Sequence, residues 1–194
     1  MFVYQIKIEY SGSDFVGWQI QKNGLSIQGI LEKVLSKFLN NKIKVIGSGR
    51  TDAGVHANEQ SAHFTTPKKI IYKEKFISSI NYFLKNYPIA ILSLKKRPKG
   101  FHARHSANNR TYKYFIINRL SSLVLKKNKA WHIKKKLDVK IMRKGAEILK
   151  GTHNFSTFRA SSCQAKSPIK TIRKAMIKKD KNQIVLTFQS KSFL

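Results

Sequence analysis

Residues 47–64 read GSGRTDAGVHANEQSAHF, from Gly47 to Phe64. The stretch combines glycines and small polar residues with Arg50 and Asp52, a composition that neither an amphipathic helix nor an ordinary strand needs. Asp52 is also one of only nine acidic residues in a chain with 39 basic ones. We therefore predict a passage from a strand into a loop, in which Asp52 either performs chemistry or anchors a turn.

Arg50 and Asp52 are two positions apart, so in an extended backbone their side chains project to the same side. An ionised carboxylate beside an arginine can act as a nucleophile, a base or a metal ligand. The alternative is a rigid turn in which the Asp52 side chain accepts backbone N–H groups. The residues alone leave both interpretations open.

His56 and His63 lie in the same stretch and invite a metal-site hypothesis. Their spacing of seven suits neither a helix turn nor a hairpin site, so we expect a polar contact in a loop and a histidine within a strand. The chain has no cluster with zinc-ligand spacing. Its single cysteine, Cys163, excludes an intrachain disulfide and is typical of a reducing compartment.

The charge balance of the chain indicates which class of binding partner to expect. Lysine and arginine exceed aspartate and glutamate by a formal net charge of +30, which favours nucleic acid as the binding partner, although codon bias toward lysine accounts for part of it. Hydrophobic residues make up 41%, enough for a core. No apolar run approaches the roughly twenty residues that span a bilayer, and the N-terminus reads as a strand rather than a signal peptide. We expect a cytoplasmic protein.

Hydrophobic periodicity predicts an α+β fold. We expect two similar lobes, residues 1–100 and 101–194, each with a mostly antiparallel sheet and helices on one face. The first lobe would carry the Asp52 loop, and residues 121–136 would form a loop. The predicted strands are residues 2–10, 42–46, 60–66, 89–94, 110–118, 169–177 and 183–189, and the predicted helices are 27–39 after an N-cap at Ser26, 76–84, and 137–149 with Asp138 near its start.

A second candidate region, residues 101–114, mixes basic, aromatic and small polar residues. Aromatic rings between cations suit an unstacked base and its phosphates. Tyr112 and Tyr114 would share one face of a strand. The alternative is that one or both are ordinary core tyrosines.

The motifs taken together resemble those of the tRNA pseudouridine synthase A family. The resemblance extends over most of the chain, with several motifs in the same order and at matching separations. Besides residues 47–64, it rests on DFVGWQ at 14–19, SIQ at 26–28, FHAR at 101–104, YKY at 112–114 and NFSTFRA at 154–160.

This resemblance implies an isomerase that converts uridine to pseudouridine at positions 38, 39 and 40 of the tRNA anticodon stem-loop. By resemblance Asp52 is the nucleophile, Arg50 orients it and stabilises the flipped nucleotide, and Tyr112 stacks on the base. No metal or cofactor is implied, and a cytoplasmic homodimer is expected.

One departure concerns the C-terminal end. In the family, the residues matching Phe193 and Leu194 lead into a helix with a basic residue that pairs with the catalytic aspartate. Here the sequence ends at Leu194, so we expect a second lobe that is incomplete relative to the family. Two further hypotheses stay open: a truncated tRNA-binding remnant without catalytic turnover, and a generic basic RNA chaperone.

Overall fold

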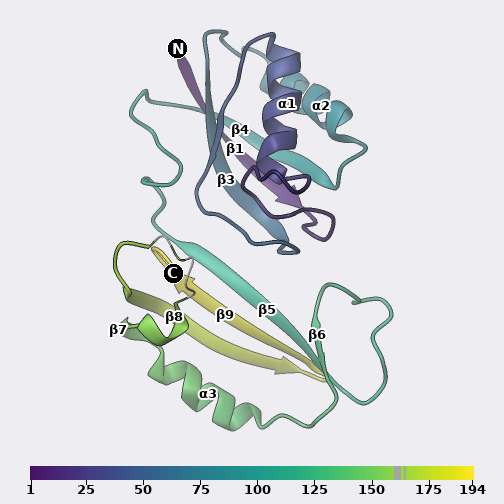
Figure 1. Cartoon of the computed structure of the whole chain (residues 1–194), viewed down its shortest axis with the longest axis vertical. Coiled ribbons are helices and arrows are strands. Elements are labelled where there is room, and N and C mark those ends of the chain that lie inside the picture. Colours follow the sequence, from purple (N-terminus) through teal and green to yellow (C-terminus); the bar gives the residue numbers. More distant parts are fainter. Residues whose placement is uncertain (160–162, 164) are drawn as a thin grey trace. The chain divides into compact units, whose positions relative to one another are not determined.

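The computed structural model describes residues 1–159, 163 and 165–194 (Figure 1). These residues form two compact units, Met1–Ala107 and Asn108–Leu194. The sequence placed the end of the first lobe at residue 100, whereas residues 101–107 lie with the first unit in the structure. Ala160, the last residue of the NFSTFRA motif, lies outside the described residues.

The first unit is a four-stranded antiparallel sheet with two helices on one face (Figure 1). The sheet order is β2 (Val45–Gly47), β3 (Ala57–Thr66), β1 (Phe2–Tyr10) and β4 (Ile89–Arg97). The helices are α1 (Ile27–Leu39) and α2 (Lys73–Leu84). The predicted strand at 2–10 and helix at 27–39 are confirmed at both ends, since alternation and a capped helical face are the strongest local signals.

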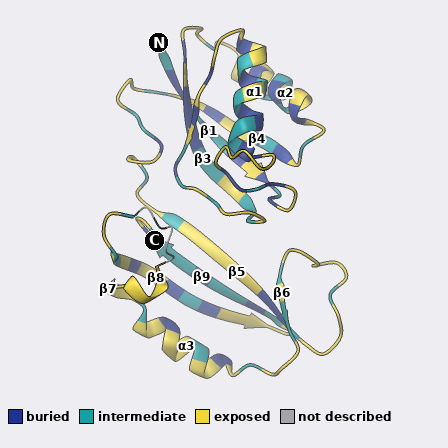
Figure 2. Cartoon of the chain, viewed as in Figure 1, coloured by how far each residue is buried: buried dark blue, intermediate teal, exposed yellow. Residues whose placement is uncertain are grey.

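The core of this unit lies between the sheet and its helices. The even-numbered residues of β1, from Tyr4 to Tyr10, are buried there, because successive side chains of a strand point to opposite faces (Figure 2). Helix α1 contributes Ile27, Leu31 and Leu35, all almost fully buried. The helix begins as predicted, with the Ser26 hydroxyl accepting the Gly29 N–H at 3.2 Å.

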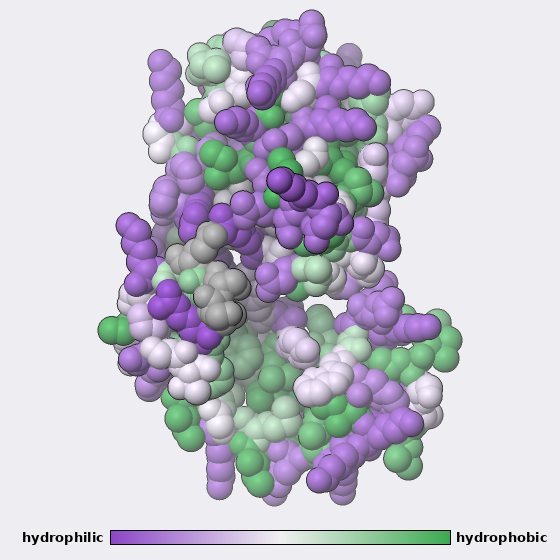
Figure 3. All heavy atoms as spheres, viewed as in Figure 1, coloured by the Kyte–Doolittle hydropathy of each residue, from purple (hydrophilic) through white to green (hydrophobic). Residues whose placement is uncertain are grey.

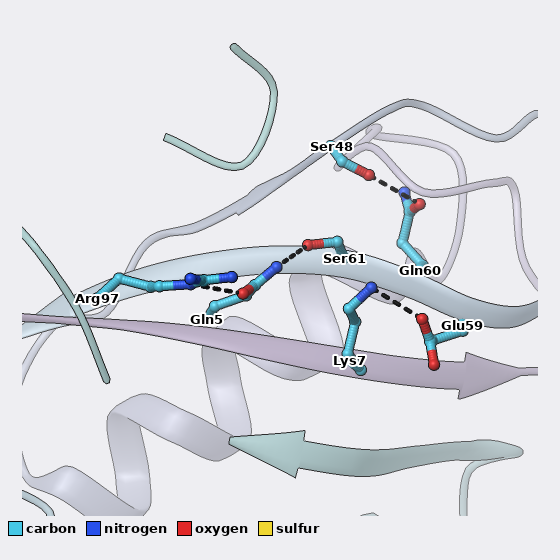
Figure 4. Close-up of polar contacts among 7 residues, drawn as sticks. All are labelled: Gln5, Lys7, Ser48, Glu59, Gln60, Ser61 and Arg97. Atoms are coloured by element: carbon cyan, nitrogen blue, oxygen red, sulfur yellow. Dashed lines mark hydrogen bonds and ion pairs between the residues drawn. The ribbon is translucent and has the colours of Figure 1, made fainter. Parts of the chain in front are cut away.

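The opposite side of the sheet carries polar side chains, and we call it the polar face: Gln5, Lys7, Glu59, Ser61, His63, Lys95 and Arg97. The Arg97 Nε donates to Gln5 Oε1 at 2.8 Å, and Gln5 Nε2 donates to Ser61 Oγ at 2.8 Å (Figure 4). An ion pair of 2.8 Å joins Lys7 to Glu59 beside them. Hydrogen bonds thus bind three neighbouring strands together on this face.

The second unit is a five-stranded sheet in the order β6 (Trp131–Ile133), β5 (Arg110–Asn118), β9 (Gln183–Ser190), β8 (Ile169–Asp180) and β7 (Gly151–Asn154). Among the described strands, only the β5–β6 pair is parallel. Helix α3 (Val139–Ile148) packs on this sheet, and a short 3-10 turn spans Ser156–Phe158. The predicted α+β class, with two lobes and mostly antiparallel sheets, is confirmed.

Two short strands are absent from the sequence prediction. Strand β6 lies inside the predicted loop at 121–136, and β7 follows α3. Both are edge strands of three or four residues, too short to show an alternating pattern, and the residues of β7 are all exposed. The start of α3 follows the prediction, because the Asp138 carboxylate accepts the N–H groups of Lys140 and Ile141.

Among the described residues, no helix combines the length and the apolar character that a membrane crossing requires.

Candidate active site

The loop that carries Asp52 connects β2 to β3 and spans residues 48–56. Its first part is hydrogen-bonded back onto β3. The Ser48 N–H donates to the Ser61 carbonyl at 2.7 Å, and Gln60 Nε2 donates to the Gly49 carbonyl at 2.6 Å. The Ser48 hydroxyl also donates to Gln60 Oε1 (Figure 4). The chain therefore leaves β2 along a fixed path.

The middle of the loop is held by Thr51. Its carbonyl accepts the backbone N–H of Trp18 at 2.9 Å, and its hydroxyl lies 2.8 Å from the hydroxyl of Tyr10. Trp18 and Tyr10 are both buried, with exposed fractions of 3% in each case. The residue directly before Asp52 is thus tied to the core of the first unit.

Glycines allow this close approach. A Cβ atom at Gly17, where φ is +113°, would lie 2.7 Å from the Thr51 carbonyl oxygen. One at Gly12 would lie 2.1 Å from the Val55 carbonyl oxygen. The Gly12 N–H donates to His56 Nδ1 at 3.2 Å. Residues 12–18 and the loop touch backbone to backbone, which explains Gly17 in the early sequence motif and Gly12 just before it.

The side chain of Asp52 is exposed. The turn here closes through its backbone, since the Val55 N–H donates to the Asp52 carbonyl at 3.2 Å. Within the part of the chain that the structure describes, the carboxylate accepts no hydrogen bond and joins no ion pair. The turn therefore forms without the carboxylate, in contrast to the anchoring alternative. Arg50 is also exposed, and among the described residues no ion pair links it to Asp52.

Tyr112 lies on β5 of the second unit, where 38% of its surface is exposed. Its ring meets the ring of Phe193 edge to face, with centroids 5.0 Å apart. Tyr114, two residues on, contacts Trp131 in the same manner at 6.4 Å. Both tyrosines are packed on one side and exposed on the other, so they are neither fully buried core residues nor unsupported rings.

Sequence reasoning missed the role of His63. The residue lies on β3 with 5% of its surface exposed, and its Nδ1 accepts the backbone N–H of Ala103 at 3.2 Å. The rings of Phe101 and His102 pack against it. This contact fastens residues 101–106 to the polar face. The only signal in the sequence was a histidine within a predicted strand, and this does not identify the residue that it contacts.

His63 is neutral in this arrangement, because Nδ1 must keep its lone pair to accept the Ala103 N–H. Burial lowers the pKa of His63 below its ordinary value of 6.5, and the neighbouring His102 lowers it further, while a hydrogen bond with the backbone of Ile46 acts in the opposite direction. His56, as predicted, makes a polar contact in the loop. Among the described residues, no group of three or more His, Cys, Asp or Glu side chains could hold a metal ion.

Comparisons with known proteins agree with one another. The sequence pattern of the family described as tRNA pseudouridine synthase matches residues 6–106 and 146–194. A protein of Pelagibacter ubique (strain HTCC1062) named tRNA pseudouridine synthase A is 57% identical over 194 residues, which are 100% of this chain and 79% of that protein. A protein of the same name from Parvibaculum lavamentivorans (strain DS-1 / DSM 13023 / NCIMB 13966) is 42% identical over 98% of this chain and 77% of its own length.

The packing of residues 12–18 against the loop predicts the effect of Gly17→Ala. The alanine would have to keep the positive φ of Gly17, and its Cβ would overlap the Thr51 carbonyl oxygen. The free energy of unfolding should therefore fall, and the backbone N–H of Trp18 should exchange with solvent faster. Gly54→Ala is the matched control, because Gly54 has φ +77° but no atom within 4 Å of the added Cβ. The control should lose about 1–3 kcal/mol. Equal losses in chemical denaturation would contradict the close contact.

The contact of His63 with Ala103 predicts a dependence of stability on pH. Because the folded pKa of His63 lies below 6.5, the unfolded chain binds the proton more readily, and unfolding free energy should fall as the pH drops below about 6.5. In His63→Asn, which does not titrate, the fall between pH 7.5 and 5.5 should be smaller than in the wild type. His153→Asn, at an exposed position, is the control. Identical pH profiles in the wild type and His63→Asn would refute the assignment.

Proposed function

We propose that this chain, which belongs to the tRNA pseudouridine synthase family, isomerises uridine to pseudouridine at positions 38, 39 and 40 of the tRNA anticodon stem-loop. The observation that carries the proposal is the Asp52 carboxylate. It is exposed on a loop whose backbone is fixed on both sides, and none of the described residues engages it. An enzyme that positions a nucleophile needs this combination of a rigid backbone and an uncommitted side chain.

In the proposed reaction the target nucleotide leaves the helical stack, at a cost of a few kcal/mol. The Asp52 carboxylate attacks either the ribose C1′ or the uracil ring. The bond between N1 and C1′ breaks, the uracil turns while it is held, and C5 bonds to C1′. The bond between Asp52 and the nucleotide also breaks, which returns the free carboxylate. The proton lost from C5 is balanced by one gained at N1, so the product is an isomer of the substrate.

Two further residues have proposed roles. Arg50 would orient Asp52 and hold the displaced nucleotide, since a guanidinium forms paired hydrogen bonds with a phosphate or a carboxylate. Tyr112 would stack on the flipped uracil and assist proton removal from C5. Its partly exposed ring, supported by Phe193, is of the kind that stacks on a base.

The charge of the chain supports an RNA substrate. A formal net charge of +30 attracts a polyanion, and hydrophilic side chains cover much of the visible surface (Figure 3). Affinity for tRNA should therefore fall steeply as the salt concentration rises.

We also propose that the protein works as a cytoplasmic homodimer, as the family resemblance implies. Light scattering of the purified protein would measure the mass of the particle in solution.

Asp52→Ala tests the nucleophile. With the carboxylate removed, pseudouridine formation in a transcribed tRNA should fall by about a thousandfold or more, while tRNA binding persists. Carbodiimide-based mapping reads the product at each uridine. Glu147→Gln, at an exposed acidic residue of α3, is the matched control and should react as the wild type does. If the wild type formed no more product than Asp52→Ala, the protein would bind tRNA without turnover.

Two substitutions of Tyr112 distinguish a role in base stacking from a role in proton transfer. Tyr112→Phe keeps the ring and loses the hydroxyl, so kcat should fall with little change in KM. Tyr112→Ala loses both, and KM should also rise, because base stacking contributes about 1–3 kcal/mol. Tyr114→Ala removes a neighbouring ring from the same strand face and controls for general damage to β5. Equal effects of Tyr112→Ala and Tyr114→Ala on kcat and KM would contradict a specific role of Tyr112 in the site.

A further inference from the structure

Three histidine rings stand in a row at the edge of the polar face. The ring centroids of His63 and His102 are 4.9 Å apart, and those of His102 and His105 are 4.3 Å apart. The row passes from the buried His63 through the half-buried His102 to the exposed His105. Arg104, also exposed, lies between the last two in sequence. The cluster is outside the residues to which the reaction was assigned above.

The backbone that carries His102 and His105 is held in place. Besides the bond between Ala103 and His63, the Phe101 N–H donates to the Pro98 carbonyl at 3.0 Å, and the Ser106 N–H donates to the His102 carbonyl at 2.8 Å. The Phe101 ring is covered by the guanidinium of Arg97, whose Cζ lies 5.0 Å from the ring centroid. Residues 101–106 are thus a preformed turn.

The electrostatic surroundings of His102 are positive. Arg104 and His105 face it from its own segment and His63 from β3, while Lys95 and Arg97 of β4 lie on the same polar face, where β1 contributes the neutral Gln5. The ion pairs among the described residues, Lys7–Glu59 and Lys150–Glu147, include none of the histidines of the cluster. Burial lowers the pKa of His102, and the proximity of His105 and then of Arg104 lowers it further.

We propose that His102, Arg104 and His105 form a binding site for phosphodiester groups of the RNA substrate, in which His102 takes up a proton when RNA binds. This inference rests on the proposed function for the identity of the RNA. An arginine and two imidazoles on a fixed turn offer forked and single N–H donors to phosphate oxygens. A bound phosphate would also offset the repulsion between a protonated His102 and Arg104.

The direction of the pH dependence follows from linkage. In the free protein the pKa of His102 is below 6.5, so near pH 7.5 its ring is neutral. A phosphate within contact distance favours the charged imidazole and raises that pKa. The complex then binds more protons than the free protein, and affinity must increase as the pH falls, by up to about tenfold per pH unit for each proton taken up.

His63 does not contribute to this uptake. Its ring is buried, with 5% of its surface exposed, and its Nδ1 accepts the Ala103 N–H, so it does not contact a phosphate bound at the surface. Measurements between pH 6.5 and 8.0 therefore report on His102.

The experiment measures the Kd of a transcribed tRNA between pH 6.5 and 8.0 at constant ionic strength. The wild type should bind several-fold more tightly at pH 6.5 than at 8.0. The double variant His102→Asn, His105→Asn should lose this dependence, because asparagine does not titrate. The amide oxygen introduced at position 102 can still accept the backbone N–H of residue 105, as Nδ1 of His102 does. His153→Asn, an exposed histidine of the second unit, should behave as the wild type does.

Arg104→Gln adds a second readout. Removing one phosphate contact should reduce the slope of log K against log salt by about 0.7–0.9. Inorganic phosphate, tested as a competitor, should displace tRNA weakly at equal ionic strength. Strong displacement through this cluster would make it a site for small anions and overturn the RNA assignment.

Pseudouridine formation by the wild type is measured in the same preparation, so that a failure of the proposed function can be distinguished from a failure of the proposed phosphate site. Absence of product would defeat the proposed function. Product formation with parallel pH profiles in the wild type and the double variant, or with an unchanged salt slope in Arg104→Gln, would defeat the phosphate site alone.

Discussion

The contact between residues 12–18 and the Asp52 loop is the constraint on which the candidate site depends. The Trp18 N–H and the Thr51 carbonyl meet at 2.9 Å only because Gly17 has no side chain to separate them. Trp18 is in turn buried in the core between the sheet and α1. Through this backbone contact, the packing of the first unit fixes the position of the backbone at Asp52, without using its carboxylate as a fastening.

Acidic residues are few in this chain, and that scarcity shapes its polar contacts. Apart from the ion pair between Lys7 and Glu59, the polar face uses neutral acceptors: the amide of Gln5, the hydroxyl of Ser61 and the imidazole of His63. Neutral acceptors satisfy cations such as Arg97 without cancelling the positive charge that attracts RNA. The Asp52 carboxylate, which none of the described residues engages, stands out against this background, because electrostatics alone would favour its use in an ion pair.

The extent to which the fold follows from the sequence depends on the length of each element. The strand at 2–10 and the helix at 27–39 were predicted with the correct ends, since nine or more residues carry several periods of the hydrophobic pattern. Strands β6 and β7 were missed because three or four residues carry almost none. Within the site, the sequence showed the glycines and Asp52, but it did not show which residue each glycine contacts. Gly17 lies against the backbone of Thr51, far along the chain, and a contact with backbone atoms leaves no residue-type signal in the sequence. The contact of His63 with the backbone N–H of Ala103 could not be predicted for the same reason.

The histidines show how one residue type acquires different roles within a few ångströms. His63 has its Nδ1 committed to a backbone N–H, so the neutral ring is part of the structure and a proton there costs stability. His105, at the other end of the row, is exposed, so a phosphate can contact its ring. The gradient of burial along the row therefore separates a structural histidine from one that responds to an anionic ligand, with His102 between them subject to both influences.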